Sequence, residues 1–178
     1  AHDPMRAREL LAQAGFPGGF ATDFYVPTGR YLMDRQLGEA IQAQLAEVGI
    51  RASIQAPDWG TFSAIVDAKG RAPMFLLGKG SPTGDLDFTL TLTDATGGKM
   101  NDTNLGDPAI DKLIAEQRSI LDPARRAAVL KQIQVMIYQQ YPYIVLFYED
   151  QLFATRANVH DVGVYANEFV DFSKAWKE

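Results

Sequence analysis

The first half of the chain alternates between two spacings of apolar residues. Apolar or β-branched residues occupy every second position over 20–26 and again over 50–56, which predicts two β-strands. Between them, apolar residues follow the 3.6-residue spacing of an amphipathic helix over 33–48, and Gly49 ends that helix. A continuous apolar run at 74–77 suits a third strand that is buried on both faces.

Aspartate residues mark where further helices begin. An aspartate side chain accepts hydrogen bonds from the free N–H groups of a first helical turn, and a following proline suits the first helical position. Asp3, Asp107 and Asp122 are each followed by proline, and Asp58 precedes another apolar helical pattern. The order helix, strand, helix, strand, helix, strand over 5–77 predicts an α/β fold, with a mixed but mostly parallel sheet flanked by helices.

The second half of the chain predicts a different mixture of elements. We expect a short helix over 86–92, a polar surface loop over 93–106, and strands over 144–148 and 152–155. Two helices, beginning at Asp107 and Asp122, lie between this loop and these strands. Charged residues on them are interpreted as a solvated face: Arg125, Arg126 and Lys131. Because no internal repeat or linker is visible, the chain is interpreted as a single domain over 1–178.

The composition argues against several classes of function. Of the 178 residues, 47% are hydrophobic, which is enough for the core of a globular domain. A net charge of −5 without any run of lysine or arginine argues against a nucleic-acid partner. There is no cysteine for disulfides or thiol catalysis, and no apolar stretch approaches the ~20 residues of a membrane helix. His2 and His160 lack metal-ligand spacing, so we expect no metal site and no cofactor.

The loop between the first strand and the following helix carries the first candidate ligand-binding residues. Arg30 has a planar guanidinium that can hold a carboxylate through two parallel hydrogen bonds, and Tyr31 can supply an aromatic wall. The alternatives are an Arg30 that faces solvent or pairs with Asp34, and a Tyr31 that only packs. Trp59 is a third candidate, and structural packing is its alternative role.

A second candidate loop follows the apolar run at 74–77. In α/β sheets, loops at the carboxyl ends of strands form ligand crevices. This glycine-rich loop lacks the spacing of a Walker loop. Two aspartates follow it directly, and helix capping is the alternative role for them. The candidate ligand-binding residues here are Gly80, Ser81, Thr83, Asp85 and Asp87.

Five segments resemble one known family in both order and spacing. They carry D-P, G-R-Y-x-x-D and Y-P-Y-I patterns, and they lie at 3–20, 29–50, 107–113, 122–134 and 141–147. Together they resemble the C-terminal lobe of the extracytoplasmic solute-binding proteins of ABC importers, family 5, which includes oligopeptide, dipeptide, nickel and glutathione binders. The resemblance implies one lobe of a type II periplasmic-binding-protein fold, a periplasmic or extracytoplasmic location, and no catalysis.

The resemblance also implies partners. A family member has roughly three times this length, so we expect an isolated lobe from which the N-terminal lobe is absent. The two lobes would capture a peptide or peptide-like small molecule between them, and the closed protein would deliver it to an ABC permease in the membrane. No cofactor is implied.

The family pattern assigns roles to particular residues and is broken at others. By resemblance, Arg30 pairs with the carboxylate of the ligand. Relatives have tryptophan where this chain has Lys79, and Pro82 stands where they have an aspartate that pairs with the ligand amine. Either Asp85 or Asp87 substitutes for that aspartate, or the ligand lacks the amine.

Two other classes of function remain open from the sequence. The same α/β lobe can belong to an enzyme, because a fold does not fix a function. It can also belong to a receptor or adaptor module that has lost its ligand, in which case replacing Arg30 would change no measurable affinity.

Overall fold

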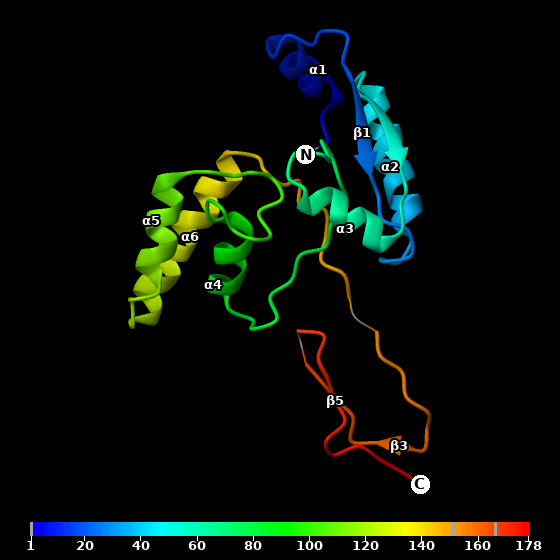
Figure 1. Cartoon of the computed structure of the whole chain (residues 1–178), viewed down its shortest axis with the longest axis vertical. Coiled ribbons are helices and arrows are strands. Elements are labelled where there is room, and N and C mark those ends of the chain that lie inside the picture. Colours follow the sequence, from blue (N-terminus) through cyan, green and yellow to red (C-terminus); the bar gives the residue numbers. More distant parts are fainter. Residues whose placement is uncertain (1, 151, 166) are drawn as a thin grey trace. The chain divides into compact units, whose positions relative to one another are not determined.

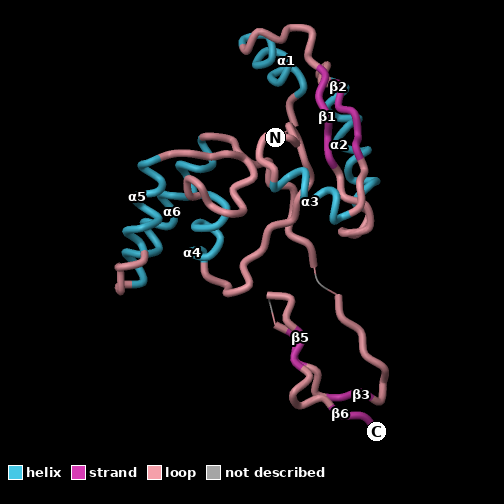
Figure 2. Tube along the Cα trace, viewed as in Figure 1, coloured by secondary structure: helices cyan, strands magenta, loops and turns pink. Residues whose placement is uncertain are grey.

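A computed structural model describes residues 2–150, 152–165 and 167–178 of the chain (Figures 1 and 2). These residues form two compact units. The first unit ends at Gly78, and the second begins at Lys79. Each unit has its own helices, strands and buried residues.

The first unit is built around two parallel strands joined by a helix. Its elements are α1 (Pro4–Gln13), β1 (Ala21–Tyr25), α2 (Asp34–Glu47), β2 (Arg51–Gln55) and α3 (Trp59–Asp67). β1 and β2 pair in parallel, with Ala21 opposite Arg51 and Tyr25 opposite Gln55. Parallel strands need a long crossover between them, and α2 supplies it (Figure 1). The strands predicted over 20–26 and 50–56 and the helices predicted for this unit are therefore confirmed to within a few residues.

Alternation along β1 divides the core of the first unit between two sides. Phe24 and Val26 are buried together with Ala52, and Ile41 and Leu45 of α2 pack against them. Tyr25 lies between Phe24 and Val26 in sequence, so its side chain is on the other face of the strand. It packs against a second buried group of Phe62, Val66 and Ala72, of which Phe62 and Val66 belong to α3. Helices therefore cover both faces of the strand pair, as the period of two in a strand requires.

The predicted strand over 74–77 takes part in this arrangement for one residue. Tyr25 donates its N–H to the Met74 carbonyl at 2.8 Å and accepts from the Leu76 N–H at 2.9 Å, so Phe75 forms an isolated parallel bridge with Tyr25. Met74 and Leu76 pack on the α2 side, whereas Phe75 and Leu77 pack on the α3 side. The prediction of a strand buried on both faces is therefore wrong, because the side chains of 74–77 are half-buried and the pairing is limited to this bridge.

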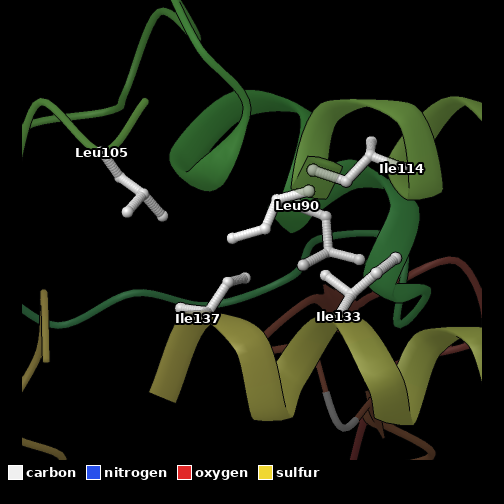
Figure 3. Packing of buried hydrophobic residues seen from close by; sticks show 6 residues of the cluster. Leu90, Leu105, Ile114, Ile133 and Ile137 are labelled. Carbon is white, nitrogen blue, oxygen red and sulfur yellow. The ribbon is translucent and has the colours of Figure 1, made fainter. Parts of the chain in front are cut away.

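The second unit has a helical core. Its helices are α4 (Leu86–Thr89), the π-helical turn η1 (Leu90–Asp94), α5 (Pro108–Gln117) and α6 (Pro123–Gln139). Figure 3 shows the buried apolar side chains that α5 and α6 direct toward Leu90 and Leu105. The members of this cluster are Leu90, Leu105, Ile110, Ile114, Ile133 and Ile137. Aspartates cap α1, α5 and α6 with proline at the first turn, as the sequence predicts.

The tail of the second unit forms short antiparallel pairs. β3 (Val159–His160) pairs with β6 (Trp176–Lys177), and β4 (Gly163–Val164) pairs with β5 (Val170–Asp171).

Two predictions for the second unit are wrong. Residues 144–148 and 152–155 form no strand, and Ile144, Val145 and Tyr148 are 83%, 75% and 95% exposed. Their apolar pattern suits a strand, but a strand also needs a hydrogen-bonding partner. The polar segment 93–106 is not a surface loop either, because it begins inside η1 and several of its residues are buried: Thr93, Asp94, Asn101, Asp102 and Leu105.

Candidate functional site

The loops that follow β1 and β2 are brought together by the parallel pairing of the two strands. Beyond the last ladder pair, the Thr28 N–H donates to the Pro57 carbonyl at 3.0 Å, and Thr28 bridges Asp58. The loop that starts at Thr28 therefore begins beside the start of α3. Ligand-binding loops of α/β sheets occupy this carboxyl edge of the strands.

Arg30, Tyr31 and Trp59 form one cluster at this edge. The Arg30 guanidinium carbon lies 5.1 Å from the centroid of the Tyr31 ring and 5.1 Å from the centroid of the Trp59 ring. The two rings meet edge to face, with centroids 6.3 Å apart. Trp59 in turn stacks on Phe62 at 5.6 Å, and Phe62 is fully buried. The Arg30 cation thus lies against two aromatic rings, one of which, Trp59, packs on a core residue.

Tyr31 also ties this cluster to the end of the 74–77 segment. The Gly78 N–H donates to the Tyr31 hydroxyl at 2.9 Å. A Cβ on Gly78 would lie 3.0 Å from Cε1 of the same ring, so only glycine fits beside Tyr31 without moving it. The tyrosine ring thus lies between Arg30 and Gly78, in contact with both.

Two carboxylates at this edge, those of Asp34 and Asp58, form hydrogen bonds with other groups than the Arg30 guanidinium. Asp34 is buried and accepts hydrogen bonds from the backbone N–H groups of Arg30, Tyr31 and Arg35. Burial alone would raise the pKa of Asp34, but these bonds outweigh it and hold the pKa below its usual value. Asp58 caps α3 through Thr61, whose hydroxyl and backbone N–H lower the pKa of Asp58.

Neither of these two carboxylates therefore occupies the N–H donors of the Arg30 guanidinium. Among the described residues up to Gly78, no carboxylate forms an ion pair with the Arg30 guanidinium. The predicted alternative of a side-chain pair with Asp34 is not formed, since Asp34 contacts the backbone of residue 30 and not its guanidinium. An exposed guanidinium that is stacked on two rings can accept a planar anion through two parallel N–H bonds.

The second candidate loop lies in the second unit and is held by hydrogen bonds of its own. The Ser81 hydroxyl donates to the Asp85 carbonyl at 2.9 Å and lies 3.2 Å from the Thr83 hydroxyl. The Thr83 hydroxyl also accepts from the Asp85 N–H at 3.2 Å. A Cβ on Gly80 would meet nothing within 4 Å, so the backbone is open there. The roles of these residues in ligand binding stay predictions.

Both aspartates after this loop pair with arginines of the second unit. Asp85 caps α4, and its two carboxylate oxygens accept from Arg126 at 2.8 and 2.7 Å. The Arg126 hydrogen bonds, with the Asp87 N–H, lower the pKa of Asp85 to about 2. Asp87 accepts from Arg118 at 2.7 Å and from Gln117, which is fully buried. This pairing gives both carboxylates a structural role, and their role as ligand contacts stays a prediction.

Arg126 corrects the interpretation of the helix charges as a solvated face. Its side chain is 29% exposed, and it also donates to Gln117 from within α6. The capping role weighed for Asp85 is confirmed, whereas its partner on a helix 41 residues away carries no signal in the sequence.

A second buried polar group surrounds Lys79. Its ammonium lies 3.1 Å from Oδ2 of Asp102, 2.9 Å from the Met100 carbonyl and 5.3 Å from the centroid of the Tyr143 ring. Burial raises the pKa of Asp94 above its usual value, and burial together with the nearby Asp94 raises the pKa of Tyr143 to about 12. Lys79 is therefore directed into the interior of its unit, where it is paired.

The described residues offer neither a metal site nor a membrane-spanning helix. They contain no group of three or more histidine, cysteine, aspartate or glutamate side chains placed to hold a metal ion. Of the helices in this part of the chain, none is both long and apolar enough to cross a bilayer.

Comparison with known proteins identifies the family. The family model described as bacterial extracellular solute-binding proteins, family 5 (middle), matches residues 1–101, which is more than half of the chain. The chain belongs to this family. It is 32% identical over 166 residues to the glutathione-binding protein GsiB of Escherichia coli K12, a match that covers 89% of this chain and 32% of GsiB.

Solved structures of solute-binding proteins share the fold. The DppA protein of Helicobacter pylori in complex with the peptide STSA matches 80% of this chain and 28% of its own, at 27% identity and a TM-score of 0.71. A dipeptide-binding protein of Pseudoalteromonas sp. SM9913 in complex with Met-Leu matches 99% of this chain and 36% of its own, at 24% identity and a TM-score of 0.80. These likenesses confirm the predicted α/β class of the type II periplasmic-binding-protein fold.

The match also defines how much of a family 5 protein is present. The chain spans about a third of the length of the curated relatives it matches. The residues that sequence and structure bring together at the edge of the strands, Arg30, Tyr31 and Trp59, all lie within the segment that the family model covers.

Proposed function

We propose that this chain is part of the substrate-binding component of an ABC importer, and that the complete protein captures a peptide or peptide-like small molecule for a membrane permease. Membership of family 5 supports this function. So do the similarities to a glutathione-binding protein and to a structure that contains a bound peptide. In this proposal the chain is one lobe, the N-terminal lobe of the same protein completes the clamp, and the location is periplasmic or extracytoplasmic.

The observation that best supports the proposal is that the Arg30 guanidinium is exposed and has no carboxylate partner within the described part of the first unit. The guanidinium is stacked on Tyr31 and Trp59. A solute carboxylate supplies what this group lacks, because a fork of N–H donors binds both oxygens at once. We propose that Arg30 holds a carboxylate of the ligand, with the two rings forming the adjacent wall.

The same proposal assigns no catalysis to the chain. The cluster around Arg30 offers a cation and aromatic faces, which bind and orient a solute. Asp34 and Asp58, the acidic residues next to it, are bound by backbone donors and have lowered pKa values, so they stay ionised and do not act as general acids near neutral pH.

Calorimetric titration of the complete protein tests this function. Glutathione and the dipeptide Met-Leu are the probes, together with the C-terminal amide of Met-Leu as the matched ligand that lacks the carboxylate. Hydrogen bonds to charged groups are worth about 1.5–3 kcal/mol each, so the loss of two in Arg30→Ala is expected to weaken carboxylate binding about 100-fold or more. The amide ligand should bind both proteins equally weakly.

Arg35→Ala is the matched control variant. Arg35 is an exposed arginine on α2 whose side chain pairs with Glu39 at 2.9 Å, so its removal changes the net charge equally without touching Arg30. If Arg30→Ala and Arg35→Ala have the same small effect on affinity, Arg30 does not hold the ligand. If the wild-type protein binds neither probe, the result favours the alternative of a receptor or adaptor module that has lost its ligand.

A further inference from the structure

The carboxylate of Asp34 folds back beneath the loop that carries Arg30. Asp34 is the first residue of α2, and the residue is only 6% exposed. Its Oδ2 atom accepts hydrogen bonds from the Arg30 N–H at 3.0 Å and from the Tyr31 N–H at 3.3 Å. Its Oδ1 atom accepts from the Arg35 N–H at 2.8 Å. A single buried group thus satisfies three backbone donors around one turn.

The two bonds to Oδ2 fix the direction in which the Arg30 side chain leaves the backbone. The N–H of Arg30 belongs to the peptide plane before its Cα, and the N–H of Tyr31 belongs to the plane after it. When both planes point at one oxygen, the two dihedral angles at Arg30 are set together. The bond from Cα to Cβ of Arg30 then has a fixed direction relative to α2.

The loop does not reach this shape by local preference alone. Gly29, directly before the pair, and Met33, two residues after it, both have left-handed backbone conformations, with φ of +72° and +55°. A glycine adopts this conformation freely, whereas a methionine is strained in it. Met33 also provides no side-chain cap for α2. The hydrogen bonds of Asp34 to Arg30, Tyr31 and Arg35 span this turn and so help to stabilise it.

The far end of the Arg30 side chain is held as well. Its guanidinium stacks on Tyr31 and Trp59, and Trp59 stacks on the buried Phe62. An arginine that is fixed at both its backbone and its head loses little side-chain freedom when a ligand binds. Because Asp34 bonds the backbone, the N–H donors of the guanidinium stay available for the ligand.

We propose that Asp34 is a positioning residue that presets the Arg30 guanidinium between Tyr31 and Trp59. The effect on the conformation of Arg30 follows from the contacts of Asp34 itself. The effect on affinity rests on the proposed function, in which Arg30 holds a carboxylate. The two parts are measured separately.

The conformational part is tested by nuclear magnetic resonance on the complete protein with selectively labelled arginine. Protons of the Arg30 side chain lie over two ring faces and should resonate upfield of those of the exposed arginines. Arg30→Lys, which removes the signal, assigns it. Asp34→Ala removes all three acceptor contacts, so the Arg30 signal is expected to move to the position of an exposed arginine. Asp34→Asn keeps one acceptor oxygen, so the signal is expected to move part of the way.

Asp122→Asn serves as the matched control. Asp122 is also a carboxylate at a helix start, and it accepts from the Arg125 N–H at 2.7 Å. It should leave the Arg30 signal in place. If Asp34→Ala does not fold, by circular dichroism, Asp34→Asn decides the test, since it has the same shape as aspartate. An Arg30 signal that stays in place in the folded Asp34 variants overturns the proposal.

The affinity part uses glutathione and Met-Leu as probes. The loss of a preset arginine is expected to weaken carboxylate binding about 3- to 10-fold in Asp34→Asn, and to have no further effect in the Arg30→Ala background. If the signal moves but the wild-type protein binds neither probe, Asp34 positions Arg30 and the proposed function fails. If the wild-type protein binds a probe and the signal does not move, the function stands and the positioning role is wrong.

Discussion

Replacing Gly38 with alanine tests how closely α2 approaches β1. Gly38 lies on the buried face of α2, and Val26, just beyond the end of β1, is fully buried. A Cβ added to Gly38 would lie 2.8 Å from Cγ2 and 3.2 Å from Cγ1 of Val26. Favourable carbon–carbon separations are about 3.5–4.0 Å, so the new methyl group overlaps both branches of a side chain with a stiff χ1 angle.

Two effects of opposite sign decide the outcome. Alanine is favoured over glycine in a helix by about 0.8–1 kcal/mol. Forcing an extra carbon into a packed core costs about 1–3 kcal/mol. We therefore expect Gly38→Ala to lower the free energy of unfolding of the first unit by up to about 2 kcal/mol. Ala40→Gly, at an exposed position of the same helix, has only the propensity effect and should lower it by about 1 kcal/mol.

Urea denaturation followed by the fluorescence of Trp59 measures this quantity, with Trp176 replaced by phenylalanine so that only the first unit reports. Val26→Ala removes both overlapping methyl groups, so it should cost less stability in the Gly38→Ala background than in the wild type. The reasoning is refuted if Gly38→Ala stabilises the unit by about 1 kcal/mol, the mirror image of Ala40→Gly. That result would mean that α2 moves away from Val26 without cost.

The other two predictions concern the second unit. Because the pKa of Asp85 is lowered to about 2 from about 3.9 in an unfolded chain, its pairing with Arg126 stabilises the folded unit fully above about pH 4 and is lost as the pH falls toward 2. Arg126→Gln should raise the pKa of Asp85 in a carboxyl-carbon titration, and an identical titration curve in both proteins would contradict the pairing. Asn101 is 1% exposed, and it donates to the carbonyls of Ala95 and Leu105 and accepts from the Leu105 N–H. Asn101→Ala should therefore lower the free energy of unfolding by about 2–4 kcal/mol, which a calorimetric scan detects as a lower melting temperature. A loss of free energy below about 0.5 kcal/mol would show that water replaces these bonds.

The parts of the fold that were predicted correctly depend on local signals. A capping aspartate followed by proline acts on its own helical turn, and Asp3, Asp107 and Asp122 each begin a helix as expected. The alternation that predicts β1 and β2 also arises within a few residues, because each face of a paired strand contacts a different environment.

The wrong predictions concern features that depend on distant partners. The apolar pattern over 144–148 is that of a strand, but pairing requires a second strand, and its residues are extensively exposed. The segment over 93–106 is polar and was expected at the surface. Asn101 is buried nonetheless, because its amide substitutes for the backbone partners that the turn around it lacks.

The candidate site was predictable residue by residue but not as an assembly. The sequence singled out Arg30, Tyr31 and Trp59 separately, and their stacking depends on the register of β1 against β2, which places Thr28 beside Asp58. The role of Asp34 as an acceptor for backbone N–H groups needs the left-handed turn at Met33, which no sequence rule indicates for methionine.

The contact between Tyr31 and Gly78 should couple the residues that are tolerated at these two positions. The hydroxyl of Tyr31 binds the N–H of residue 78, and a Cβ at that residue would lie 3.0 Å from the ring, so that the ring would have to shift. A relative with an aromatic residue at the position of Tyr31 should therefore keep glycine at the position of Gly78, whereas a relative with a small residue at the first position is free to carry a side chain at the second. Covariation of these two positions across family 5 would record the contact in sequences whose structures are unknown.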